Sequence, residues 1–184
     1  MKDFTTLTET TLTSTEIYDG QVVHLFKDSV SLPNGKPATR EVIRHVGAVG
    51  IVPMTSDGKV IVERQFRYPL NQVITEIPAG KLDSKSEDRL AAAKRELEEE
   101  TGLLADEWIC LGDYVPAAAF CDERITLYLA KGLHEGTRNL DEDEFLNIME
   151  VDLEELVQDI MDGKITDGKT QVALLKVYHM YKAK

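Results

Sequence analysis

The segment from Gly80 to Leu103 constrains the fold of this chain more than any other, because it predicts a turn and a loop followed by a helix with clustered charge. On an α-helix each residue advances by about 100°. With Glu96 as the origin, Glu99 lies near -60° and Glu100 near +40°, so these carboxylates share an arc of about 100°, while Glu98 falls on the opposite side. A neighbouring apolar stripe consists of Leu90, Ala93 and Leu97. The helix is therefore expected to bury one flank and to present an acidic cluster beside it.

This acidic cluster predicts a cation site. Carboxylates this close repel one another unless a cation lies between them, and Mg²⁺ takes oxygen ligands while keeping waters and substrate phosphate. Arg95 precedes Glu99 by four residues and can orient it through an ion pair. Gly102 is a natural helix C-cap, and the spacing of Ser84 and Glu87 predicts a capping box with the helix starting near residue 85.

The turn before the loop contributes backbone groups to the same region. Ala79 and Gly80 follow Pro78, and a glycine there lets the backbone approach a ligand closely. The carbonyl of Ala79 could then serve as a further metal ligand.

The rest of the chain predicts strands in the middle with one helix inserted and two appended. Expected strands cover residues 46–53, 60–66, 73–77, 108–115, 125–130 and 145–151, and expected helices cover 86–101, 152–162 and 168–182. Before them, Asn34-Gly35 between two extended runs predicts a hairpin. We therefore expect an α+β fold, an α/β/α sandwich with a mixed β-sheet, in residues 46–184. An N-terminal antiparallel β-ribbon, residues 1–45, should pack on this domain or on a second subunit.

Composition narrows the possible partners. The chain has 184 residues, a net charge of -12 and a pI near 4.8. Such acidity argues against binding to nucleic acid or to an anionic membrane, but not against a phosphorylated small molecule that arrives with a metal. No signal-peptide core or membrane-spanning run is present in the sequence. Cys110 and Cys121 are expected to be buried free thiols, and the protein is expected to be cytoplasmic.

The residues from Gly80 to Leu103 resemble the Nudix box. The matching positions are Glu87, Arg95, Glu96, Leu97, Glu99, Glu100, Gly102 and Leu103. Six residues separate Gly80 from Glu87 where the box usually has five, which leaves the metal cluster intact but alters the loop. The resemblance implies that Glu96, Glu99, Glu100 and the Ala79 carbonyl bind Mg²⁺, with Mn²⁺ as a substitute. It implies that Arg95 and Glu87 orient these ligands, and that the catalytic groups include Glu99, Glu100 and Arg95.

Further stretches resemble the ADP-ribose pyrophosphatase branch of the Nudix hydrolases. They are Arg64 to Pro69, Glu76 to Lys81, Pro116 and the N-terminal ribbon, which in that branch mediates a homodimer. The implied reaction is hydrolysis of ADP-ribose to AMP and ribose 5-phosphate. The implied substrate-binding residues are Arg40, Glu41, Arg67, Glu76 and Gly80. Arg67 could contact a phosphate or the terminal ribose, Glu76 the sugar hydroxyls, and Arg40 the base.

A second acidic cluster, residues 141–144, supplies the candidate catalytic base. In the resembling branch a Glu of this loop acts as base or as additional metal ligand, and both Glu142 and Glu144 fit, with Glu123 as a weaker third candidate. Three alternatives stay open. They are another Nudix substrate such as a different nucleoside diphosphate sugar, a dinucleotide or an oxidised nucleotide, a non-catalytic nucleotide-binding Nudix module, and a purely structural Ca²⁺-binding helix. The last explains neither Gly80 nor Arg95.

Overall fold

The computed structural model describes residues 7–140 and 145–182 and divides into two compact units. The first comprises Met1–His45 with Ala117–Glu123, and the second comprises Val46–Pro116 with Arg124–Lys184. The domain division expected from the sequence did not include Ala117–Glu123 in the first unit. A parallel bridge between Ile43 and Cys121 joins that segment to the ribbon, and such a pairing between distant residues leaves no local signal.

The first unit is a three-stranded antiparallel sheet. Its order is β1-β2-β3, with β1 at Thr10–Asp19, β2 at His24–Ser31 and β3 at Pro37–Ile43. The predicted Asn-Gly turn is confirmed between β2 and β3. Gly35 has a φ of 79°, which favours glycine, and its amide donates to the Leu32 carbonyl at 2.8 Å.

The second unit contains two sheets and three α-helices among its described residues. One sheet has the order β7-β4-β9-β8, with β7 at Ala79–Lys81, β4 at Ala48–Pro53, β9 at Ile125–Glu135 and β8 at Leu103–Tyr114. The other has the order β10-β5-β6, with β10 at Leu146–Asp152, β5 at Lys59–Arg67 and β6 at Gln72–Glu76. The helices are α1 (Arg89–Thr101), α2 (Leu153–Met161) and α3 (Gly168–Lys182), and a 3-10 turn, η2, covers Tyr68–Leu70. Because β4 pairs in parallel with β9 and antiparallel with β7, the first of these sheets is mixed, as predicted.

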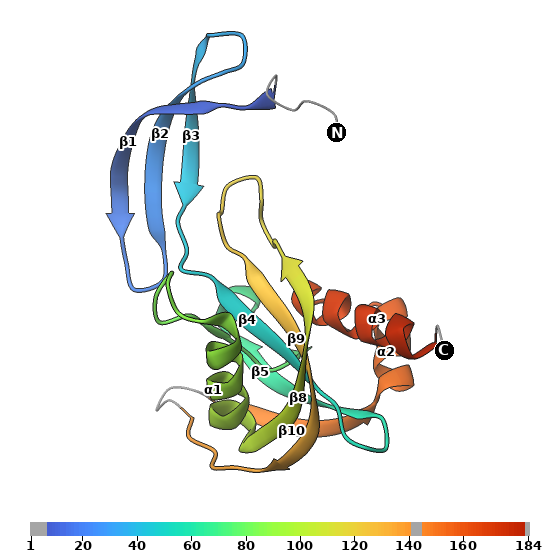
Figure 1. Ribbon diagram of the computed structural model, residues 1–184. Coiled ribbons are helices and arrows are strands. Elements are labelled where there is room, and N and C mark those ends of the chain that lie inside the picture. Colours follow the sequence, from blue (N-terminus) through green and yellow to red (C-terminus); the bar gives the residue numbers. More distant parts are fainter. Residues whose placement is uncertain (1–6, 141–144, 183–184) are drawn as a thin grey trace. The chain divides into compact units, whose positions relative to one another are not determined.

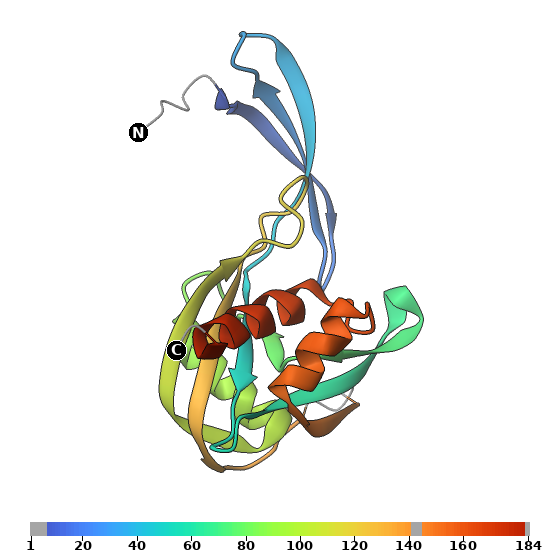
Figure 2. The ribbon, with the colours of Figure 1, turned by 90° about the vertical axis from the view of Figure 1, so that its right-hand side faces the viewer.

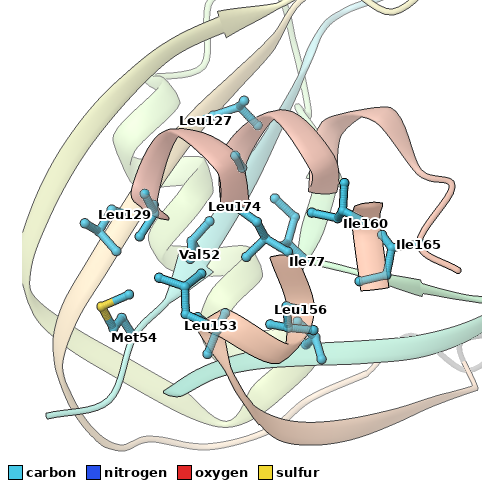
Figure 3. Close-up of a cluster of buried hydrophobic side chains, with 14 of the residues drawn as sticks. Val52, Met54, Ile77, Leu127, Leu129, Leu153, Leu156, Ile160, Ile165 and Leu174 are labelled. Atoms are coloured by element: carbon cyan, nitrogen blue, oxygen red, sulfur yellow. The ribbon is translucent and has the colours of Figure 1, made fainter. Parts of the chain in front are cut away.

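Strand β4 is fully buried because helices cover both faces of its sheet. Val49 and Ile51 pack with α1, whereas Ala48 and Val52 pack with α2 and α3. This alternation follows from the two-residue period of a strand. Figure 1 shows α1 on one side of β4 and β9 and α3 on the other, and Figure 2 looks onto α2 and α3 with the sheets behind them. The cluster beneath α2 and α3 includes the large aliphatic side chains drawn in Figure 3.

Three local expectations were wrong. Helix α1 starts at Arg89, not near residue 85, because its N-cap is Asp88, whose carboxylate accepts from the Ala91 amide at 2.8 Å. Strand β8 begins at Leu103, directly after α1, rather than at residue 108. Cys110 is exposed, since it alternates along β8 with Ile109 and Leu111, which pack against the core. Both cysteines are free. No described helix is long and apolar enough to cross a membrane.

Candidate functional site

Arg95 contacts three carboxylates on and beside the acidic flank of α1. Its Nη1 donates to Oε1 of Glu96 at 2.8 Å and to Oε2 of Glu99 at 3.0 Å, and its Nη2 lies 3.4 Å from Oε1 of Glu87. Partial burial lowers the pKa of the Arg95 guanidinium, but the carboxylates of Glu96 and Glu99 outweigh burial and the pKa is raised. Arg95 therefore brings together Glu96 and Glu99, two of the three carboxylates that the sequence predicted to share one flank, and adds Glu87 from the loop.

The loop before α1 gives Glu87 a role other than capping. Its Oε2 accepts from the amide of Asp83 at 2.6 Å, while its Oε1 faces Arg95. Leu82 anchors the start of the loop in the core beneath α1. The longer loop thus closes on itself through Glu87, and its carboxylate still reaches Arg95.

Strand β7 lies directly against the acidic flank of α1. The amide of Ala79 donates to Oε2 of Glu100 at 3.0 Å. Gly80 pairs with Val49 of β4, and a Cβ atom on Gly80 would overlap the carboxylate of Glu96. Glycine at position 80 is therefore required for the close approach of Glu96, a side chain of the protein itself.

The C-terminal turn of α1 is held by residues distant in sequence. Gly102 caps it with a φ of 72°, and its amide donates to the Glu98 carbonyl at 2.8 Å, as predicted. The Nε of Arg138 donates to the Glu100 carbonyl at 2.7 Å, and the amide of Asn139 donates to the Glu99 carbonyl at 3.0 Å. A cation at this end also complements the helix dipole. Nothing in the sequence singled out Arg138.

A second charged cluster lies at the end of β6. Glu76 is only 3% exposed, and its Oε2 accepts from Arg67 Nε at 2.7 Å while its Oε1 accepts from Lys169 Nζ at 2.5 Å. Lys169 also lies 3.1 Å from Oδ2 of Asp167. Burial lowers the pKa of Arg67, but the hydrogen bond and the charge of Glu76 outweigh it and the pKa is raised. The sequence predicted Arg67 and Glu76 as a pair of site residues but missed Lys169.

Several predicted residues do not belong to this part of the structure. Arg40 lies in the first unit, where its guanidinium pairs with Glu9 and lies 2.5 Å from that carboxylate, and Glu41 is its neighbour on β3. Glu123 also belongs to the first unit and lies 3.6 Å from Nδ1 of His45. Glu142 and Glu144 lie outside the described residues. Their predicted roles stay predictions.

The residues of α1 and β7 fit a hard divalent cation. Within residues 7–140 and 145–182, no three acidic, His or Cys side chains converge closely enough to share a metal ion. Glu96 and Glu99 are turned toward Arg95, and Glu100 toward Ala79. The donor set nevertheless consists of oxygens only, which suits Mg²⁺ or Mn²⁺. The Glu96 carboxylate fills the space beside Gly80 and therefore lies next to the backbone of β7.

Comparison with known protein families identifies the family to which this fold belongs. The family model described as NUDIX domain matches residues 44–172. The chain belongs to the Nudix family. A second model, described as nucleoside diphosphate sugar hydrolase N-terminal domain, matches residues 9–43. The Nudix fold expected from the sequence is confirmed, and Nudix hydrolases generally use a divalent metal ion.

Individual relatives are similar along nearly the whole Nudix chain. A methanol dehydrogenase activator of Bacillus methanolicus is 44% identical over 168 residues, which cover 90% of each chain. An ADP-ribose pyrophosphatase of Bacillus subtilis is 42% identical over 170 residues, which cover 91% of each chain. The solved structure of an ADP compounds hydrolase superposes with a TM-score of 0.84 over 96% of both chains, at 23% identity, and this supports the fold.

Proposed function

We propose that this Nudix hydrolase cleaves the diphosphate of ADP-ribose, giving AMP and ribose 5-phosphate, with Mg²⁺ as its metal. The observation that carries this proposal is the 42% identity to an ADP-ribose pyrophosphatase over 91% of both chains, the N-terminal unit included. The carboxylates Glu96, Glu99 and Glu100, which the chemistry requires, are all present and share one flank of α1.

The residues of α1 and β7 would hold the metal. Glu96, Glu99, Glu100 and the Ala79 carbonyl are the proposed ligands, and Arg95 orients two of these carboxylates. Bound divalent cations would neutralise the diphosphate and polarise the bond that is cleaved. The hydrogen bond from Ala79 to Glu100 keeps β7 next to the helix, so the ligands from the two elements stay close together.

The cluster at the end of β6 would bind the substrate through Arg67. Its Nε is engaged by Glu76, but neither Nη group donates to a described residue, and the side chain is 39% exposed. A guanidinium with free Nη groups suits a phosphate or ribose oxygen. Because both oxygens of Glu76 are engaged by cations, we assign Glu76 to holding Arg67 rather than to direct contact with sugar hydroxyls.

The remaining roles follow from the resemblance. Arg40 and Glu41 would line the base pocket, contributed across a homodimer formed through the ribbon. Gly80 would lie beside the bound substrate, and Glu142 or Glu144 would take the proton from the attacking water. The ligand would be a small-molecule nucleotide rather than nucleic acid, and the protein would act in the cytoplasm.

A product-resolved substrate panel tests the proposal. Purified protein is incubated with Mg²⁺ and ADP-ribose, GDP-mannose, NADH, diadenosine polyphosphates or oxidised dGTP. We expect AMP and ribose 5-phosphate from ADP-ribose at the highest kcat/KM. Cleavage of a triphosphate with ADP-ribose untouched would overturn the substrate assignment. No cleavage of any compound with Mg²⁺ or Mn²⁺ would favour a binding module.

A regulatory role is the second candidate, because the relative at 44% identity is named an activator of another enzyme. The same panel is therefore accompanied by an assay of methanol dehydrogenase with and without this protein. A rise in the dehydrogenase rate would support that role. If the rise persists with a variant that no longer cleaves ADP-ribose, activation and hydrolysis are separate functions.

A further inference from the structure

Lys169 is a buried lysine at the N-terminus of a helix, an environment that does not favour a cation. It is the second residue of α3 and is only 8% exposed. Burial of an ammonium group is costly unless it is paired, and the positive end of the helix dipole at this terminus opposes a cation. Glu76 and Asp167 offset both costs, since each has an oxygen within 3.1 Å of Nζ. The partners of Lys169 are thus the reason for its position.

The effect of Lys169 on Glu76 is to occupy one of its two oxygens. An arginine beside a carboxylate ordinarily forms two parallel hydrogen bonds, one to each oxygen. Here Arg67 forms one, from Nε to Oε2, while Nζ of Lys169 donates to Oε1. Neither Nη group of Arg67 donates to a residue in the described part of the chain.

The charges around Glu76 explain why two cations are needed. Glu63 is 1% exposed and lies directly opposite Glu76 in the register of β5 and β6. Like charges opposite one another destabilise a sheet. With Asp167, three carboxylates surround Arg67 and Lys169. Without the Lys169 charge, Arg67 would be the nearest cation to these three carboxylates. The Arg67 guanidinium would then be drawn toward them.

We propose that Lys169 is a positioning residue for the substrate: by occupying Oε1 of Glu76, it keeps the Nη groups of Arg67 outside the ion pair and available to an oxyanion of the nucleoside diphosphate. This inference rests on the proposed function only for the identity of that ligand. Lys169 itself does not touch the substrate. Replacement of Lys169 should let Arg67 close a bidentate pair with Glu76 and withdraw its Nη groups from the ligand.

Steady-state kinetics of Lys169→Met with ADP-ribose and Mg²⁺ test the proposal. Loss of one charge-assisted hydrogen bond to the ligand predicts a KM raised about tenfold, with kcat within about threefold of wild type, since such a contact contributes equally to ground and transition states. Lys169→Arg keeps the cation and should retain a KM within about threefold of wild type, because the hydrogen bond to Oε1 is preserved. Lys176→Met is the matched control, because Lys176 lies on the same helix and donates to the Leu111 carbonyl.

A double-mutant cycle separates positioning from general destabilisation. In an Arg67→Met background, Lys169→Met should raise KM by less than about twofold, because the group through which it acts is already gone. A further tenfold rise in that background would overturn the proposal. So would an unchanged KM in the single variant, with thermal unfolding and circular dichroism confirming that it is folded.

A second variant covers the case in which Lys169→Met does not fold. Lys169→Gln keeps a polar side chain for Asp167 but lacks the charge and reach that hold Oε1 against Arg67, so it should also raise KM. A wild-type KM in Lys169→Gln would overturn the proposal. If the wild-type protein does not cleave ADP-ribose, the proposed substrate fails. The same variants are then compared on the panel compound that wild type cleaves, so the two failures are distinguishable.

Discussion

The amide of Ala79 lies 3.0 Å from Oε2 of Glu100, so the strand before the loop and the helix after it are joined by a hydrogen bond between residues 21 positions apart. This bond brings the backbone of β7 to the acidic flank of α1. Gly80, the next residue, leaves the room in which the Glu96 carboxylate lies. Two consecutive residues of one short strand thus position two of the three carboxylates.

Glu99→Gln should lower kcat for ADP-ribose by at least about a hundredfold, because several kcal/mol of transition-state charge stabilisation depend on the metal. The melting temperature should change little, since a glutamine oxygen can still accept from Arg95. Glu98→Gln is the control on the same helix, where Glu98 accepts from the Thr137 amide at 3.2 Å on the opposite side. Near-normal turnover in Glu99→Gln would contradict the metal assignment.

Gly80→Ala should displace the Glu96 carboxylate rather than strain the backbone, since the added Cβ overlaps that side chain. The Mg²⁺ concentration for half-maximal activity should rise by about tenfold, the lower end of the effect expected when a metal-binding group is misoriented. A magnesium titration of activity measures it, with thermal unfolding recorded in parallel. The same magnesium dependence as wild type would show that Glu96 is not a ligand.

Asp88→Ala should destabilise the protein by about 1 kcal/mol, because Asp88 is the N-cap of α1 and its loss leaves the Ala91 amide without its partner. Ser84→Ala is the matched control and should cost less than about 0.5 kcal/mol, as expected of a surface substitution away from such a feature. Urea denaturation of both variants gives the comparison. Equal losses would mean that the loop residue also caps the helix.

Tyr128→Phe should remove part of the loss of stability at alkaline pH. Burial, with smaller contributions from the charges of Cys110 and Asp88, raises the pKa of Tyr128 above its ordinary value of 10.0. The folded protein therefore binds this proton more tightly than the unfolded chain does. Its contribution to stability is complete below pH 10 and is lost as the pH rises through the folded pKa. Melting temperatures between pH 9 and 11 should fall less steeply in Tyr128→Phe, whereas Tyr68→Phe, at a residue 86% exposed, should follow wild type.

Arg138→Met should loosen the C-terminal turn of α1. The guanidinium donates to the carbonyls of Glu100 at 2.7 Å and Leu146 at 3.3 Å, so its loss should cost about 1.5–3 kcal/mol, the range for hydrogen bonds that involve a charged group. Denaturation and kcat are measured together, because the same turn carries two proposed metal ligands. Arg124→Met, whose guanidinium is 4.0 Å from Asp113 and largely exposed, is the control. A stable but inactive Arg138→Met would indicate a role in catalysis beyond holding the turn.

Local periodicity explains how much of the site the sequence could predict. The flank shared by Glu96, Glu99 and Glu100 follows from 3.6 residues per turn, and the pairing of Arg95 with Glu99 follows from a separation of four residues. The hairpin at Asn34-Gly35 is equally local, because only a few residue types accept its backbone angles. The sequence did not identify the N-cap of α1, since Ser84 and Asp88 both lie before the helix. The path of the loop places Asp88 at that position.

Tertiary structure alone decided which distant residues support these groups. Lys169 is 93 residues from Glu76, and Arg138 is 38 residues from Glu100, yet each holds its partner through a hydrogen bond of 2.7 Å or less. Neither pairing leaves a pattern in the sequence, because its geometry depends on how α3 and the segment after β9 pack against the sheet and α1. By itself, the sequence determined which carboxylates share the helix flank. The packing determined which distant cations hold the last turn of α1 and the Glu76 carboxylate, since hydrogen bonds and ion pairs between separate elements form only after those elements meet.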